Sequence, residues 1–326
     1  MVGRLADIRG QDRAVALLRR YLDSGRIPPG LLFFGEEGIG KEKTAEAFAA
    51  ALLCRARGPA GACGQCPDCV LCASGSHPNR LRVFPENRNI LIEEIRGLQE
   101  ELSLKAFSDR PRVVLIVPAD RMTIQAANAL LKTLEEPPPA THLVLVSHRL
   151  SRLPPTIVSR CQKVPFSPLS PEEAAEIVRN LPEGEGARRP DAIRAAAACA
   201  GGSPGRALEL LDDAEGERAA WLRLLAQPDA AAISKTAAGW KGAGETAPLL
   251  AIPLAILRDL ALLSSGAEAD IMNRDLVDSL RPVAARKSPG AWTRAFRELL
   301  AMSAMPPQAQ KPLMLEAFLF GLHRKE

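Results

Sequence analysis

Short apolar runs recur along the first half of the chain, separated by sequence that favours helices. They are LLFF at 31–34, VVLIV at 113–117, LVLVS at 143–147 and a weaker LRVF at 81–84. Strands buried on both faces lose the alternation of apolar and polar residues, and helical crossovers join parallel strands. The pattern therefore predicts an α/β domain with a mostly parallel sheet. Ligands of such sheets bind beyond the carboxyl ends of the strands.

The strand signals stop after Phe166. The sequence SPEE at 170–173 supplies an N-cap serine, a first-turn proline and a capping-box glutamate, which together start a helix. A second helix start follows at Ser203. We therefore expect the α/β domain to end near residue 166, a small helical domain at 167–213 and an all-α domain at 214–326.

A further helix is predicted from Thr123, and it stops at the prolines 137–139. Its last residues are Glu135 and Glu136, the wrong charge for the carboxyl end of a helix dipole. We favour two solvated carboxylates over a binding role for this pair.

A phosphate loop is indicated at GEEGIGKEKT, residues 35–44, which lies between an apolar run and a helix-prone run. Such a loop cradles phosphate with backbone N–H groups, while a lysine neutralises charge and a hydroxyl helps to hold Mg²⁺. Its candidate phosphate-binding residues are Gly35, Gly38, Gly40 and Lys41. The hydroxyl is missing, because Glu42 follows the lysine. Repulsion between this carboxylate and a phosphate about 4 Å away is on the order of 4 kcal/mol at an effective dielectric near 20.

Five of the seven cysteines crowd into residues 54–72. In a reducing compartment such a cluster more often holds a metal than disulfides. Four thiolates suit tetrahedral Zn²⁺, whereas an iron–sulfur run would need a different last spacing and a following proline. Spacing alone leaves open whether Cys54 or Cys72 joins Cys63, Cys66 and Cys69.

Composition narrows the class of protein only slightly. The 326 residues carry 42 Lys and Arg against 38 Asp and Glu, and this net charge of +4 does not by itself predict a nucleic-acid surface. Charges come too early for a signal peptide, and no run of about twenty apolar residues occurs. We therefore expect a soluble cytoplasmic protein that does not use a membrane.

Four segments together resemble the AAA+ subunits of the bacterial DNA polymerase III clamp loader. They are the phosphate loop, ADRMTIQAANALLKTLEEPP at 119–138, LVLVS, and LPPTIVSRC at 153–161. The likeness is close over residues 1–166, weaker over 167–213, and limited to length and helicity beyond. It implies an AAA+ domain with a zinc module at 54–72, a helical lid and an all-α collar for oligomerisation.

The candidate ATP site differs from the ATP site of the family's motor subunits, gamma and tau. Their Asp-Glu pair would fall on Val117 and Pro118, and their sensor arginine would align with Gly205. Asp120 belongs to a segment shared across the family and does not replace the lost carboxylates. The likeness therefore points to the delta-prime subunits, whose ATP site is degenerate. It implies no intrinsic ATPase, and binding of ATP or ADP at this site is doubtful.

The resemblance also assigns residues to two other roles. Without the resemblance, the arginine at position 160 would be read as a surface or ion-pairing residue. The SRC match implies that Arg160 reaches the γ-phosphate bound by the adjacent motor subunit, where a guanidinium supplied in trans is worth about 10³ to 10⁵ in rate. The family's zinc module implies Cys54, Cys63, Cys66 and Cys69 as ligands of a structural Zn²⁺.

The leading hypothesis is a non-hydrolysing clamp-loader subunit of the DNA polymerase III holoenzyme. It implies a hetero-pentamer with gamma or tau and delta, a sliding clamp as target, and primed DNA reached through the assembly. Two other classes stay open. One is an active ATPase motor in which Glu42 or Asp120 stands in for the lost metal ligands, and the other is a zinc-dependent nucleic-acid binding module.

Overall fold

The computed structural model describes residues 3–85, 88–104, 110–181, 190–227, 229–240, 247–268, 270–304 and 309–323. The chain divides into two compact units, Met1–Leu169 and Ser170–Glu326. The first unit contains the sheet, and the described part of the second unit is helical. The division into three domains, 1–166, 167–213 and 214–326, stays a prediction.

The sheet has five parallel strands in the order β2-β3-β4-β1-β5. They are β1 (Gly30–Phe34), β2 (Arg80–Val83), β3 (Arg112–Ile116), β4 (Thr141–Ser147) and β5 (Gln162–Pro165). The parallel sheet predicted from the apolar runs is thus confirmed. Strand β5 was not predicted, because it lies at an edge and only Val164 of its four residues is buried.

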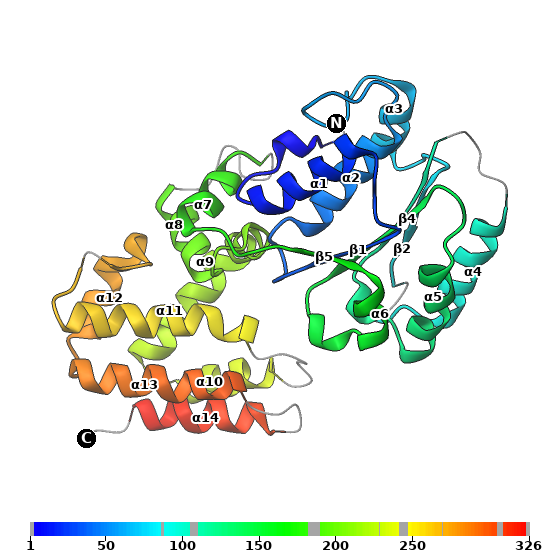
Figure 1. Ribbon diagram of the computed structural model, residues 1–326. Helices are drawn as coiled ribbons and strands as arrows, with labels where there is room; N and C mark the ends of the chain where they lie inside the picture. The colour runs from blue at the N-terminus through cyan, green and yellow to red at the C-terminus, as the bar shows by residue number, and fades with distance from the viewer. Residues whose placement is uncertain are drawn as a thin grey trace. The chain divides into compact units, whose positions relative to one another are not determined.

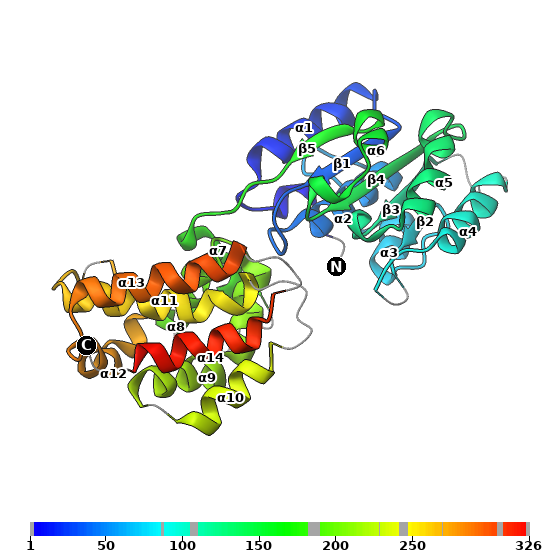
Figure 2. The same cartoon turned by 90° about the horizontal axis from the view of Figure 1, so that it is seen from below.

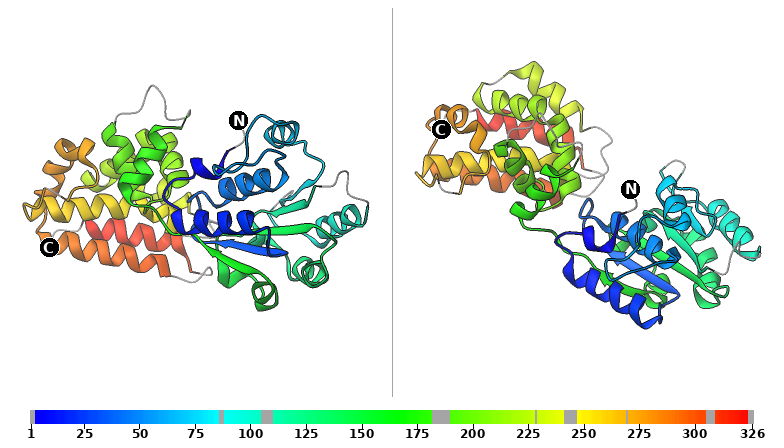
Figure 3. Two further views of the ribbon diagram at one scale, coloured as in Figure 1. Left: turned by 45° about the horizontal axis from the view of Figure 1, so that its top comes forward. Right: turned by 90° about the horizontal axis from the view of Figure 1, so that it is seen from above.

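Helices cover both faces of this sheet (Figures 1 and 3). One face carries α1 (Asp12–Ser24) and α2 (Lys41–Leu53), with α3 (Pro67–Ser74) beside α2, and the other carries α4 (Ile92–Ser103), α5 (Ile124–Glu135) and α6 (Pro155–Arg160). Successive side chains of a strand point to opposite faces of the sheet. Leu32 of β1 belongs to the core under α4 and α5, whereas Phe33 packs against Phe48 of α2 with ring centroids 6.5 Å apart.

Short turns of 3-10 helix occupy several connections of the first unit. They are η1 (Leu5–Asp7), η2 (Ala119–Arg121) and η3 (Leu150–Arg152). The last two follow the carboxyl ends of β3 and β4, the end of a parallel sheet where ligands bind.

The second unit is a helical bundle built around Trp221, Trp292 and Leu260. Its described helices are α7 (Pro171–Arg179), α8 (Pro190–Cys199), α9 (Pro204–Ala226), α10 (Ala230–Ala238), α11 (Ala247–Ser264), α12 (Val277–Ala284), α13 (Pro289–Ala301) and α14 (Lys311–Leu322), with the short turns η5 (Arg274–Leu276) and η6 (Met302–Ala304). Helix α11 lies beside α13, and α10 lies beside α14 (Figure 2).

Both helix starts predicted for this unit are present. The Ser170 hydroxyl accepts a hydrogen bond from the N–H of Glu173 at 3.2 Å, and Ser203 accepts one from the N–H of Arg206 at 3.3 Å. None of the helices in the described part of the chain combines the length and apolar character that a membrane span requires.

Candidate functional site

The phosphate-loop motif joins the end of β1 to the first turn of α2, as the sequence predicts. Its three glycines have φ values of +148°, +74° and +93° at Gly35, Gly38 and Gly40, where side chains with a Cβ are strained. A Cβ on Gly35 would also lie 2.4 Å from the carbonyl oxygen of Phe166. The loop between β1 and α2 thus has backbone conformations that favour glycine at all three positions, and its binding of phosphate stays a prediction.

Lys41 and Thr44 both donate hydrogen bonds to backbone carbonyls of this loop. Lys41 is only 3% exposed, and its ammonium group donates a hydrogen bond to the carbonyl of Glu36. Thr44 is buried, and its hydroxyl donates to the carbonyl of Gly40 at 2.8 Å. That hydroxyl satisfies a backbone group of its own helix, so it does not replace the metal-binding hydroxyl that the loop lacks.

Glu42 has a partner that the sequence did not indicate. Its carboxylate lies 2.7 Å from a terminal guanidinium nitrogen of Arg82 on β2, 40 residues away. Arg82 also lies 3.0 Å from Glu46, which pairs with Arg80 at 2.6 Å. The Glu42 carboxylate, which the sequence argument placed against a phosphate, is thus held toward β2 by Arg82.

The ends of β3 and β4 meet near the same loop. Val117 and Pro118 follow β3, so this strand end offers no carboxylate. Asp120 accepts a hydrogen bond from the backbone N–H of His148 at 2.8 Å and thereby ties the turn after β3 to the turn after β4. His148 also lies 3.5 Å from Glu37. Burial, with the nearby Lys41 charge, lowers the pKa of His148.

Arg160 is the last residue of α6, and it is held by two acceptors. Its Nε donates to Oε1 of Glu135 at 2.7 Å, and one terminal nitrogen lies 2.5 Å from the same oxygen. The other terminal nitrogen donates to the carbonyl of Thr156 at 3.0 Å. Glu135, which we expected to be a solvated carboxylate, has a side chain that is 49% exposed, and it also forms an ion pair with Arg160. The wrong charge at the end of α5 was the signal for this contact.

Arg160 lies at the opposite end of β1 from the phosphate loop. A Cβ on Gly30, the first residue of β1, would meet the carbonyl oxygen of Arg160 at 3.3 Å. The loop begins after Phe34, the last residue of that strand. A strand rises about 3.3 Å per residue, so β1 separates these two ends by about 13 Å. The structure therefore does not bring Arg160 and Lys41 into one site.

Four cysteines converge where α2 ends and α3 begins. The sulfur atoms of Cys54, Cys63, Cys66 and Cys69 all lie within 4.8 Å of one another. Two of the pairs, Cys54 with Cys66 and Cys63 with Cys69, are 3.9 Å apart. Bonds of about 2.3 Å to a tetrahedral zinc would place two sulfurs about 3.8 Å apart. The four thiols can therefore hold a metal, and the geometry suits Zn²⁺.

The surroundings of these thiols differ. Backbone hydrogen bonds from Gln65 and Cys66 lower the pKa of Cys63 to about 6, whereas burial raises the pKa of Cys54 and Cys69. Cys72, the alternative to Cys54 in the spacing argument, is not in the group of converging sulfurs, and burial raises its pKa to about 11. In space, the sulfur of Cys54 thus joins those of Cys63, Cys66 and Cys69 in one cluster.

Residues 10–170 match the family model described as DNA polymerase III, delta subunit. The DNA polymerase III subunit delta' of Pseudomonas aeruginosa is 42% identical to the chain over 177 residues, which are 53% of this chain and 52% of that protein. Subunit tau of Escherichia coli is 32% identical over 210 residues, which are 64% of this chain and 32% of the relative. The chain thus spans about half the length of the delta' relative and a third of the tau relative.

A gamma subunit-related protein of DNA polymerase III from Thermotoga maritima has a similar solved structure. The superposition covers 95% of this chain and 98% of that one, with 18% sequence identity and a TM-score of 0.43.

Proposed function

The chain belongs to the delta-prime family of DNA polymerase III clamp-loader subunits, and from this premise we propose that it lends Arg160 to the ATP site of a neighbouring motor subunit without hydrolysing ATP itself. The neighbour would be a gamma or tau subunit, in a hetero-pentamer that also contains delta. The assembly would open a sliding clamp and place it on primed DNA. We take the first unit to be an AAA+ domain, and the second to supply the lid and collar.

The position of Arg160 carries this proposal. It lies at the amino end of β1, about 13 Å from the start of this chain's own phosphate loop. A guanidinium at that end of the sheet serves a nucleotide only if another chain presents the nucleotide to it. Its side chain is 36% exposed, so a neighbouring chain can reach it.

The hydrogen bonds that Arg160 makes within this chain leave some of its N–H groups able to bind a phosphate from a neighbouring chain. A guanidinium has five N–H donors. Glu135 takes two of them along the edge formed by Nε and one terminal nitrogen, and Thr156 takes one from the other terminal nitrogen. One N–H on each terminal nitrogen remains for a phosphate oxygen. A lysine has no such planar fork and would not present this pair.

The absence of hydrolysis at the chain's own loop is supported by three features. Glu42 replaces the hydroxyl that helps to hold Mg²⁺, and it pairs with Arg82. Val117 and Pro118 stand where a strand-end carboxylate is required. The Lys41 ammonium bonds to the carbonyl of Glu36 inside the loop.

We assign the cysteine cluster to a structural Zn²⁺ held by Cys54, Cys63, Cys66 and Cys69. Four thiolates fill a tetrahedral zinc and leave no position for water or substrate. When bound, the ion would supply a cross-link between the end of α2, the loop at Cys63 and the first turn of α3.

The test is reconstitution of the loader with Arg160→Ala and single-turnover measurement of ATP hydrolysis on primed DNA. We expect ATP hydrolysis at the motor-subunit site next to Arg160 to slow by about 10³-fold or more, while hydrolysis at the other ATP sites of the loader keeps its rate. Arg20→Ala, which removes an exposed arginine on α1, is the matched control and should change nothing. Equal rates of ATP hydrolysis for loaders with Arg160→Ala and with the wild-type chain would refute the trans role. Mg²⁺-dependent ATPase activity of the isolated chain would instead favour the alternative that this chain is an active ATPase motor subunit.

A further inference from the structure

Strand β2 forms one edge of the sheet, and β3 is its neighbour on the inner side. The N–H of Val113 bonds to the carbonyl of Asn79, and the N–H of Val117 bonds to the carbonyl of Val83. In a parallel ladder, alternate residues of a strand bond to the same neighbour. The backbone groups of Arg82 and Phe84 therefore face the outer edge, where a further strand can be added.

Charged side chains often protect such an edge, but those of β2 are directed elsewhere. Arg80 pairs with Glu46 at 2.6 Å, and Arg82 pairs with Glu42 at 2.7 Å and with Glu46 at 3.0 Å. These carboxylates belong to α2, on the face of the sheet away from α4. The two arginines are thus paired with carboxylates of α2, and the Arg82 guanidinium also lies 5.5 Å from the centre of the Phe84 ring.

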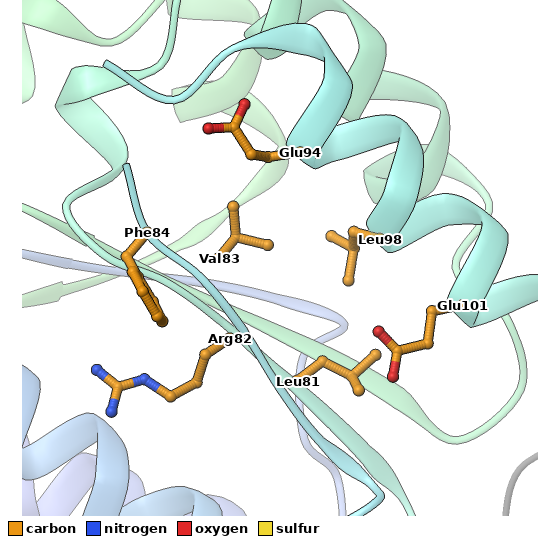
Figure 4. Close-up of a pocket in the computed structure, with 7 residues that line it drawn as sticks. All are labelled: Leu81, Arg82, Val83, Phe84, Glu94, Leu98 and Glu101. Atoms are coloured by element: carbon orange, nitrogen blue, oxygen red, sulfur yellow. The ribbon is translucent and has the colours of Figure 1, made fainter. Parts of the chain in front are cut away.

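A pocket of about 280 Å³ lies beside this edge, between β2 and α4. Its lining residues are Leu81, Arg82, Val83, Phe84, Glu94, Leu98 and Glu101 (Figure 4). Leu81 and Val83 extend from the strand toward Leu98 on the helix, and they form an apolar floor. Phe84, at the end of the strand, is 56% exposed.

Two carboxylates mark the helix side of the pocket. Glu94 lies at the end near Val83, and Glu101 lies at the end near Leu81 (Figure 4). Seven residues of helix place them about 10.5 Å apart. Positions i and i+4 of an extended strand are about 13 Å apart and point to the same face as i+2. Two long basic side chains at i and i+4 match the two carboxylates, with an apolar side chain at i+2 over the floor.

We propose that the outer edge of β2 binds an extended segment of a partner protein with the pattern basic-x-apolar-x-basic. The segment adds a strand to the sheet through the backbone of Arg82 and Phe84. Its apolar side chain enters the pocket, and its basic side chains meet Glu94 and Glu101. In strand addition the main-chain hydrogen bonds provide affinity and the alternate side chains provide specificity. This interaction does not depend on the role of Arg160.

The experiment uses the full chain and a fluorescent peptide of sequence TKTITKT, followed by anisotropy and by hydrogen exchange. Bound peptide should protect the amides of Arg82 and Phe84, whereas the amide of Leu81, which faces β3, should not change. The charge-reversed peptide TETITET should bind about tenfold more weakly or worse, which corresponds to about 1.4 kcal/mol. The same peptide methylated on alternate backbone nitrogens should not bind, because strand pairing needs its N–H groups.

Matched variants distinguish a specific effect of the pocket on peptide binding from a general effect of surface charge. Glu101→Lys should weaken TKTITKT about tenfold or more. Glu100→Lys makes the same charge change at an exposed residue turned about 100° around α4, and it should change affinity less than about twofold. The proposal is overturned if Arg82 and Phe84 gain no protection, if both peptides bind alike, or if Glu101→Lys binds like the wild type. Self-association of the chain through β2, seen by sedimentation with protection of the same amides, would also overturn it.

Discussion

One oxygen of the Glu135 carboxylate accepts hydrogen bonds along a whole edge of the Arg160 guanidinium, at 2.7 Å from Nε and 2.5 Å from a terminal nitrogen. The contact joins the last residue of α5 to the last residue of α6, which are 25 residues apart in sequence. It fixes the plane of the guanidinium before any ligand arrives. In the proposed trans role, binding of a phosphate would then cost less side-chain freedom.

Glu135→Gln should slow ATP hydrolysis at the proposed adjacent site by about two- to tenfold, less than Arg160→Ala. The amide oxygen still accepts a hydrogen bond, but it carries no full negative charge, so the Coulomb attraction between the carboxylate and the guanidinium is lost. The measurement is the single-turnover rate of the reconstituted loader at saturating ATP. A positioning role predicts a lower rate with an unchanged apparent affinity for ATP, and Glu135→Ala should be slower than Glu135→Gln.

Glu136→Gln is the matched control for this prediction, because Glu136 is the exposed neighbour at the end of the same helix. It should leave the rate unchanged. An equal effect of the two glutamine variants would assign the loss to the net charge of the surface. A faster rate for Glu135→Gln would mean that Glu135 competes with the phosphate for Arg160.

Metal content should distinguish the two cysteines that spacing left open. Cys54→Ser should lower the zinc content of the purified chain from about one ion to much less than one, because its sulfur is one of the four that converge. Cys72→Ser should retain the ion. Structural zinc sites contribute on the order of 10 kcal/mol to folding, so chelation should also lower the thermal midpoint of the wild-type chain. Zinc retained by Cys54→Ser and lost by Cys72→Ser would reverse the ligand assignment.

The sequence predicted the parts of the fold that depend on local patterns. The runs that became β1, β3 and β4 are buried on both faces and therefore largely apolar, and Gly35, Gly38 and Gly40 adopt positive φ values that favour glycine. The four thiols were recognisable from their spacing, with one ambiguity that only their arrangement in space removed.

The unpredicted features depend on residues far apart in the chain. Arg82 meets Glu42 across 40 residues, and Arg160 meets Glu135 across 25 residues, so no local pattern names the partner in either pair, although the wrong charge at the end of α5 draws attention to Glu135. Strand β5 has one apolar residue facing inward and lies at an edge, which weakens the strand signal. The position of Arg160 at the amino end of β1 likewise follows only from the sheet order.

Lys41→Ala should leave ATP hydrolysis by the reconstituted loader within about twofold of the wild-type rate. In a working phosphate loop this lysine neutralises phosphate charge, and its loss abolishes turnover. Here its ammonium group bonds to the carbonyl of Glu36, and the metal-binding carboxylates are absent at Val117 and Pro118. The same assay with Arg160→Ala is the positive control. A loss on Lys41→Ala as large as that on Arg160→Ala would show that the chain's own loop takes part in the chemistry.

The stability of the chain should fall as the pH drops below about 6.5, and His142 should account for part of the fall. Burial lowers the pKa of His142 on β4, although a contact of 3.2 Å between its Nδ1 and the carbonyl of Pro28 opposes the shift. The unfolded chain then binds a proton near pH 6.5 that the folded chain takes up only at lower pH. The contribution of His142 is therefore fully present above pH 6.5 and is lost as the pH falls through the lower folded-state value.

His142→Gln removes this titration and keeps a hydrogen-bond donor for the carbonyl of Pro28. Thermal midpoints of the wild type and the variant should be compared at pH 7.5 and pH 5.5. Acid also releases metal from thiolates, so the informative quantity is the difference between the two proteins at each pH. The wild type should lose more stability than the variant between these values. An equal loss in both proteins would mean that the proton taken up on unfolding belongs to other groups, such as His148, whose pKa burial also lowers.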